Sequence, residues 1–244
     1  MNKIKFLFII TSILIVQISY SQNSDFTKYA IALSEITTFA DNKGFKEEVN
    51  INNSSKDIKW ISGEDGYNYT ENLDAIIVFG YKILYASDDN LILGVYYDSE
   101  GTATYSYLFN VTISDTKLKL NEVIAGGDRC HNAVILDKLN VDKDVMSFST
   151  LITPNKLISW FSESSKVLNL DDCMVCCLGF ANFKYDFEKQ FKKFESVRII
   201  EEALQENSLI KKTYLDFVKE EPLKLSLLLN EDELKDFIKA FQEK

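Results

Sequence analysis

The sequence predicts an α+β fold: an N-terminal helix, an antiparallel β-sheet of five or more strands arranged as a meander in the first two-thirds, and a helical C-terminal third. The prediction rests on changes in the hydrophobic period along the chain. Apolar residues recur at helical spacing over residues 24–40, then form short β-prone runs from about residue 58 to residue 151. Helical spacing returns after Pro154. The length favours one domain over residues 22–244, β-rich over 45–152 and helical over 153–244.

Residues 1–21 are predicted to be a cleavable signal peptide. Lys3 and Lys5 stand at the start of an apolar run that is too short to span a bilayer comfortably, and the run ends in Ser19-Tyr20-Ser21-Gln22. The alternative, a retained anchor, would need a longer apolar stretch. We therefore expect an exported protein, periplasmic or extracellular, with no membrane insertion after cleavage. This exit sequence resembles that of Bacteroidetes secretory leaders, which implies a bacterial envelope or secretome setting.

The N-terminal helix is expected to begin at Ser24-Asp25 and to end at residues 41–44. One apolar face supports it, made of Phe26, Ala30, Leu33, Ile36 and Ala40. Residues 50–57 read as a polar loop.

The β-rich segment consists of short runs rich in Ile, Val, Tyr and Thr, which are separated by clusters of Asp, Asn, Ser and Gly. This pattern is typical of antiparallel strands joined by tight turns. The expected strands cover residues 75–85, 91–97, 102–113, 117–123 and 145–151. Gly126-Gly127-Asp128 lacks the spacing of a nucleotide-binding loop and reads as a turn between strands.

The C-terminal third is predicted to be helical. Thr153-Pro154 supplies a cap and a first-turn proline. Three further helices are expected at residues 186–206, 209–219 and 230–242. Asn230 and Glu233 have the spacing of a capping box at the start of the last helix.

For residues 178–185 the sequence does not decide between a helix and a strand. Phe183, Tyr185 and Phe187 alternate as in a strand. A wider set also fits a helix, namely Phe180, Phe183, Phe187, Phe191 and Phe194.

The chain is acidic, and removal of the leader takes away Lys3 and Lys5 and moves the net charge from −10 to −12. No basic stripe is present, which disfavours nucleic acid as a partner. The expected partner is another protein or an envelope component.

Four cysteines, Cys130, Cys173, Cys176 and Cys177, are candidates for two disulfides because thiols oxidise outside the cytosol. One bridge must run from Cys130 to the cluster at residues 173–177. The second bridge would be local, and its pairing stays open among the three clustered cysteines.

Two alternative roles exist for the cysteines. Cys130, His131, Cys173, Cys176 and Cys177 include enough soft ligands for a zinc site, although an oxidising compartment works against it. Cys173 and Cys176 also have the C-x-x-C spacing of redox motifs, but no thioredoxin-like βαβ pattern surrounds them. The expectation is a protein with no cofactor.

The sequence favours a non-enzymatic exported interaction protein, similar in role to an inhibitor or an immunity protein. It contains one histidine, so two-His metal motifs are absent, and it has no G-x-S-x-G motif. The alternative is a small secreted hydrolase that uses carboxylates or a Cys with His131. An enzyme predicts a deep cleft with converging catalytic groups and free thiols, whereas a binding protein predicts paired cysteines and a broad acidic face.

Overall fold

The computed structural model describes residues 47–50, 61–62, 68–73, 76–87, 90–99, 104–114, 116–161, 170, 176–205, 208–218 and 226–244. The predicted signal peptide over residues 1–21 and the predicted helix that begins at Ser24 lie outside the described residues.

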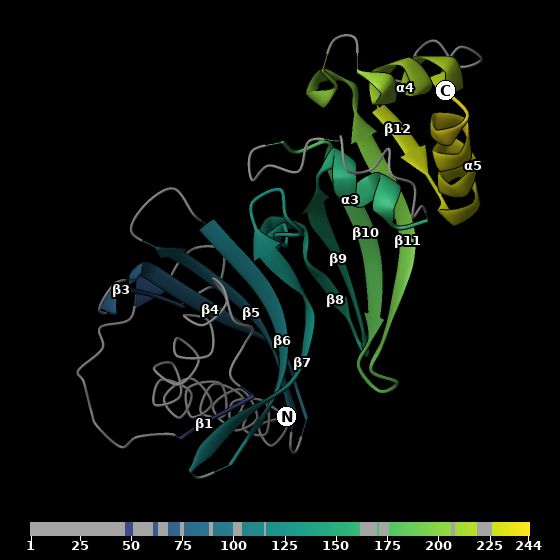
Figure 1. The fold of residues 1–244 in the computed structure, drawn as a ribbon. Coiled ribbons are helices and arrows are strands. Elements are labelled where there is room, and N and C mark those ends of the chain that lie inside the picture. The colour runs from purple at the N-terminus through teal and green to yellow at the C-terminus, as the bar shows by residue number, and fades with distance from the viewer. Residues whose placement is uncertain are drawn as a thin grey trace, which may run out of the picture.

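The described chain is mostly β-structure in two antiparallel sheets (Figure 1). The first sheet has the strand order β1-β7-β6-β5-β4-β3-β2. Its strands are β1 (Glu48–Asn50), β2 (Ile61–Ser62), β3 (Asn68–Leu73), β4 (Ile76–Ala86), β5 (Asn90–Ser99), β6 (Thr104–Ile113) and β7 (Lys117–Asp128). The expected meander is present, because β3, β4, β5, β6 and β7 each pair with the next strand along the chain.

The second sheet has the order β12-β11-β10-β9-β8. Its strands are β8 (Asn140–Asp142), β9 (Val145–Ile152), β10 (Gly179–Asp186), β11 (Phe191–Ile200) and β12 (Ser226–Leu229). Three of these strands lie within the segment that was predicted to be helical. The α+β prediction with a helical C-terminal third is therefore wrong, and the described fold is mostly β.

The largest error is the helix expected over residues 186–206, where β10 and β11 form a hairpin that continues into a short 3₁₀ turn, η3 (Glu201–Ala203). Val197 and Ile199 are buried whereas Arg198 and Ile200, which alternate with them, are only partly buried, so burial follows the two-residue period of a strand. β11 hydrogen-bonds to β10 on one side and to β12 on the other. This cross-strand pairing overrides the local helical spacing of the phenylalanines.

Three helices are found in the part of the chain that the structure describes: α3 (Pro154–Ser159), α4 (Leu209–Val218) and α5 (Glu231–Gln242). The predicted starts at Thr153 and Asn230 are confirmed. The Thr153 hydroxyl accepts a hydrogen bond from the Lys156 backbone N–H at 3.1 Å. Asn230 and Glu233 form the expected capping box. None of the described helices is long and apolar enough to cross a membrane.

The helices and the first sheet pack on the same face of the second sheet, the helices toward the end that carries Ile152 and Ala181 and the first sheet toward the end that carries Met146 and Tyr185. The helices bury an apolar core against β10, β11 and β12 that includes Val197, Ile199, Tyr214, Phe237 and Phe241. Burying such side chains stabilises the fold by about 25 cal/mol per Å² of apolar surface.

A separate core joins the two sheets. Ile92, Leu108 and Ile124 project from the first sheet and pack against a second-sheet group that includes Met146 and Phe148. The opposite face of the first sheet carries its own buried cluster, made of Phe79, Tyr81, Leu93, Val95, Tyr97, Tyr107, Phe109, Val111 and Leu118. The first sheet therefore buries side chains on both faces.

Candidate binding cleft between the two sheets

A cleft of about 900 Å³ opens beside the inter-sheet core. Residues of β4, β5 and β6 form one wall, which we call the sheet wall. Arg129, residues 133–137, residues 139–141 and Leu151 form the other, the loop wall. A volume of roughly 300–1,000 Å³ is usual for a small-molecule pocket. The lining residues are Lys82, Ile83, Leu84, Tyr96, Thr104, Ser106, Arg129, Ala133, Val134, Ile135, Leu136, Asp137, Leu139, Asn140, Val141 and Leu151.

The polar part of the sheet wall follows from the alternation of side chains along β6. Thr104 and Ser106 face the cleft, while Tyr105 and Tyr107 lie on the opposite face of the sheet. On that face their rings stack on Tyr97, with centroid distances of 4.5 Å and 6.5 Å. The alternating Thr and Tyr residues of the predicted strand were thus a signal for a two-faced strand, and the polar face contributes to the cleft.

Lys82 and Tyr96 bring further polar groups to the sheet wall. The residue paired with Lys82 on β5 is Gly94, which adds no side chain to this part of the wall. Burial raises the pKa of Tyr96 above its ordinary value, and the Asp98 carboxylate adds to this, whereas a hydrogen bond with Thr104 acts in the opposite direction. The Tyr96 hydroxyl therefore stays protonated at neutral pH.

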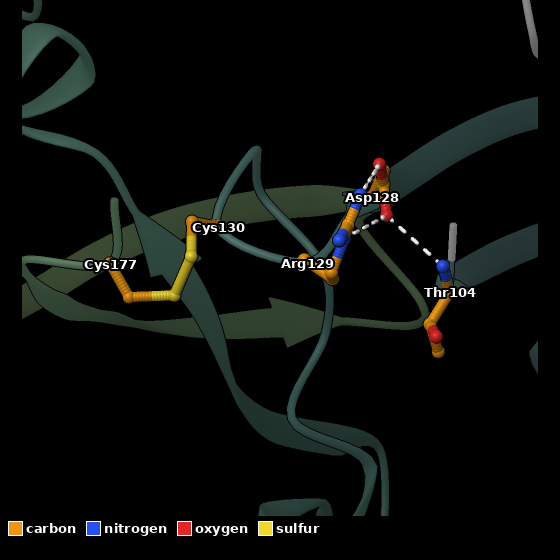
Figure 2. Close-up of polar contacts among 5 residues, drawn as sticks. All are labelled: Thr104, Asp128, Arg129, Cys130 and Cys177. Carbon is orange, nitrogen blue, oxygen red and sulfur yellow. Dashed lines mark hydrogen bonds and ion pairs between the residues drawn. A yellow bond between two sulfur atoms is a disulfide. The ribbon is translucent and has the colours of Figure 1, made fainter. Parts of the chain in front are cut away.

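Arg129 places a positive charge at the cleft, and Asp128 holds it there (Figure 2). The Arg129 Nε donates to Asp128 Oδ1 at 3.1 Å, and Nη2 donates to Oδ2 at 3.3 Å. Asp128 is 7% exposed and also accepts a hydrogen bond from the Thr104 backbone N–H at 3.2 Å. This two-point pairing orients the planar guanidinium group.

The backbone of Arg129 has φ 41°, in the left-handed region that non-glycine residues seldom occupy. It lies in a tight turn in which the His131 N–H donates to the Asp128 carbonyl at 2.8 Å. Such conformations persist only where surrounding contacts enforce them, and they concentrate at functional sites.

The loop wall is mainly apolar and is anchored on β9. The Ile135 N–H donates to the Ser149 carbonyl at 2.8 Å, and the Leu151 N–H donates to the Ala133 carbonyl at 2.9 Å. A 3₁₀ turn, η1 (Leu136–Lys138), then leads toward β8. The two walls are also bonded to each other, because the buried Ser106 hydroxyl donates to the Val134 carbonyl at 2.8 Å.

The predicted long-range disulfide is confirmed between Cys130 and Cys177, with a Cα–Cα distance of 4.8 Å. Figure 2 shows this bridge directly after the Asp128–Arg129 pair. Cys130 follows β7 of the first sheet, and Cys177 precedes β10 of the second. The bond thus ties the two sheets together at one end of the cleft.

Cys176 is also disulfide-bonded. Cys173 lies outside the described residues, so the pairing of the second bridge stays a prediction. Zinc binds thiolates, and cysteines in disulfides supply none, so Cys130, Cys176 and Cys177 are unsuited as zinc ligands in this state. Within the described ranges, no group of three or more His, Cys, Asp or Glu residues could hold a metal ion.

His131 does not line the cleft. It belongs to the turn that follows β7, and a Cβ added at Gly127 would overlap its backbone carbonyl. Gly126-Gly127-Asp128 is thus the end of β7 and not the expected turn between strands. Gly127 is required here for the close approach of the following turn.

The sequence-predicted residues and the cleft overlap little. Cys130 and Cys177 flank it, and none of the candidate cysteines nor His131 is among its lining residues. Sequence reasoning missed Arg129, Tyr96 and Lys82, which become neighbours only through sheet pairing and the turn after β7. Asp137 is the one carboxylate among the described lining residues.

Comparisons of this chain with protein-family models, with curated proteins and with solved structures found no match.

Proposed function

We propose that this chain is an exported, non-enzymatic binding protein that takes a small amphipathic component of the bacterial envelope into the cleft between its two sheets. The observation that carries this proposal is the cleft of about 900 Å³, whose mainly apolar loop wall faces a sheet wall that carries Lys82, Tyr96, Thr104 and Ser106. The predicted signal peptide and the disulfide between Cys130 and Cys177 support an exported location, because disulfides persist in oxidising compartments.

The distribution of side chains supports an amphipathic ligand. The loop wall offers Val134, Leu136 and Leu139 to an apolar body. The sheet wall offers hydroxyl groups from Thr104 and Tyr96, and Lys82 and Arg129 bring positive charge. Binding pockets commonly combine a predominantly apolar lining with a few polar groups that set orientation.

The covalent and hydrogen-bonded links between the walls support a preformed site. The Cys130–Cys177 bond and the hydrogen bond from Ser106 to Val134 each join the two sides of the cleft. A wall held in place before binding loses less conformational entropy when the ligand enters.

The chemistry of the lining favours binding over the hydrolase alternative. Glycoside hydrolysis by two carboxylates needs a pair of acids, whereas Asp137 is the one acid among the described residues that line the cleft. A Cys–His mechanism needs a thiolate, whereas Cys130 and Cys177 are bonded and His131 lies outside the cleft.

The test begins with native mass spectrometry of the protein purified from the exporting cell, where we expect a retained small-molecule adduct. Binding of the apolar fluorophore 1-N-phenylnaphthylamine then reports cleft occupancy. Leu136→Asp and Val141→Asp place a charge on the loop wall and are expected to weaken fluorophore binding about tenfold or more.

Lys138→Asp is the matched control, because Lys138 belongs to the same 3₁₀ turn as Leu136 but is exposed and does not line the cleft. It is expected to bind the fluorophore as the unaltered protein does. Equal binding by all three variants, or absence of both adduct and fluorophore binding, would contradict the proposal.

A further inference from the structure

A second, smaller pocket of about 360 Å³ lies where β7 of the first sheet meets α3, β9, β10 and β11. It shares no lining residue with the cleft. Its lining residues are Val123, Ile124, Ala125, Gly126, Asn132, Thr150, Lys156, Trp160, Phe183 and Lys192.

Two lysines supply the charge of this pocket, and no acid is among its described lining residues. Lys156 comes from α3, and Lys192 comes from β11. Positive charge gathered in one hollow contrasts with the net charge of −10 on the whole chain. Two positive charges at one hollow favour an anion there.

The Lys192 ammonium is held in position. Its Nζ donates to the Ile124 carbonyl of β7 at 2.8 Å, and it lies 5.6 Å from the centroid of the Phe183 ring. Burial lowers the pKa of Lys192; the nearby Glu122 carboxylate raises it, and Lys156 lowers it. Glu122 itself accepts a hydrogen bond from the Tyr185 hydroxyl at 2.7 Å.

Aromatic rings form the apolar side of the pocket. Trp160 meets Phe183 edge to face, with a centroid distance of 6.3 Å and an interplanar angle of 83°. Behind them Phe194 contacts both rings, at 5.5 Å from Trp160 and 5.8 Å from Phe183. Edge-to-face arrangements of this kind are favoured between aromatic rings, and a ligand ring can extend them.

Gly126 and Ala125 leave room at the β7 side of the pocket. Gly126 has φ 148°, and a Cβ at this position would overlap the Tyr107 ring. A larger residue is thus excluded there by the packing of the first sheet.

From the two lysines and the aromatic wall we infer that this pocket binds a small aromatic carboxylate, whose ring packs against Trp160 and Phe183 and whose carboxylate pairs with Lys156 and Lys192. The pairing combines a charge-assisted hydrogen bond with apolar burial in one small volume. The inference is independent of the proposed function, because the two pockets share no lining residue.

Isothermal titration of the purified protein with phenylacetate tests the inference. We expect saturable binding of phenylacetate at millimolar concentration or tighter. Acetate lacks the ring, 2-phenylethanol lacks the charge and 2-phenylethylamine has the opposite charge, and all three are expected to bind at least about tenfold more weakly. Absence of phenylacetate binding, or equal binding of 2-phenylethanol, overturns the inference.

Lys156→Met and Lys192→Met locate the site, and each is expected to weaken phenylacetate binding about tenfold or more. Lys192→Met also removes the hydrogen bond to the Ile124 carbonyl, so weaker binding by this variant could come from a changed pocket wall. Lys156→Met leaves that bond in place and therefore reports the effect of the lost positive charge. Lys193→Met is the matched control, since Lys193 follows on the same strand and pairs with Glu195 at 3.1 Å. Binding that survives both pocket substitutions, or that falls equally with Lys193→Met, overturns the assignment.

Discussion

Cys130 and Cys177 are bonded across a sequence separation of 47 residues, and the bond joins the end of β7 in the first sheet to the residues that precede β10 in the second. It stands directly beside Arg129, whose side chain lines the cleft. The position of the cleft wall and the stability of the inter-sheet arrangement therefore depend on the same covalent link.

We expect Cys130→Ala with Cys177→Ala to lower the free energy of unfolding by about 4 kcal/mol, because a loop of this length restricts the unfolded chain. Urea unfolding under non-reducing conditions measures the change. Each single substitution should cost at least as much as the double one, since it leaves a free thiol. An unchanged urea midpoint in the double variant would contradict the structural role of the bridge.

The second disulfide is predicted to join Cys173 to Cys176. Cleavage after methionine separates these two residues, because Met174 lies between them. The double variant Cys130→Ala with Cys177→Ala should contain no free thiol, and its fragments on either side of Met174 should stay linked until reduction. Mass spectrometry of the cleaved protein before and after reduction distinguishes the outcomes. Two free thiols in that variant would refute the local pairing.

Asp128 is expected to contribute to stability through its buried contacts with Arg129 and the Thr104 backbone N–H. Asp128→Ala should lower the free energy of unfolding by about 2 kcal/mol, since it leaves a partly buried guanidinium and a backbone donor without their acceptor. Asp128→Asn keeps an acceptor oxygen and should cost less. Asp142→Ala, at an exposed position on β8, is the control and should have an effect below about 0.5 kcal/mol. Similar effects at both sites, measured by urea unfolding, would contradict this prediction.

Tyr185 is expected to make stability depend on alkaline pH. It is fully buried and donates to Glu122 Oε2 at 2.7 Å. Burial first, and then the bond to Glu122 and the Glu122 charge, raise its pKa well above 10.0, although a hydrogen bond with Asn110 acts in the opposite direction. The folded state thus favours the neutral phenol. This contribution is fully present below the unfolded-state pKa of about 10 and is lost as pH rises above it.

Urea midpoints measured between about pH 9 and 11 check this expectation. The unaltered protein should lose stability more steeply over this range than Tyr185→Phe, which has no hydroxyl to ionise. Glu122→Gln keeps an acceptor but removes the charge, and its slope should lie between the two. Parallel slopes for the unaltered protein and Tyr185→Phe would rule out the predicted role of Tyr185.

Local signals predicted several elements well. Thr153, Pro154 and Asn230 act through hydrogen bonds and backbone angles within a few residues of themselves, so the starts of α3 and α5 follow from sequence. The meander is similarly local, because each strand pairs with its neighbour along the chain. The long disulfide could be predicted because Cys130 is the one cysteine outside the cluster at residues 173–177.

The hairpin of β10 and β11 could not be predicted in the same way. Its phenylalanines satisfy a helical and a strand period together, and the outcome depends on pairing with β9 and β12. β12 is a short strand that follows α4, far from β11 along the chain. Propensity within a window of about a dozen residues contains no information on such partners.

The candidate sites show the same division. Arg129 was visible in the sequence only as a neighbour of Cys130, and its role follows from the turn that directs it into the cleft. Lys156 and Lys192 are separated by 36 positions in the chain and meet in one pocket because α3 and β11 pack on the same side of β7. Residues brought together in this way show no regular spacing in the sequence, so neither site could be predicted from a motif.

What the sequence determined by itself is therefore local or compositional: the acidic charge, the strand meander, two helix caps and the long-range disulfide of Cys130, while the leader stays a prediction. Only the tertiary structure decided that most of the predicted C-terminal helical region joins a second sheet, that this sheet packs against the first, and that a cleft and a lysine pocket lie between them. The physical reason is that caps and turns are stabilised by contacts a few residues apart. Sheet pairing and pocket walls instead depend on residues that folding brings together from distant parts of the chain.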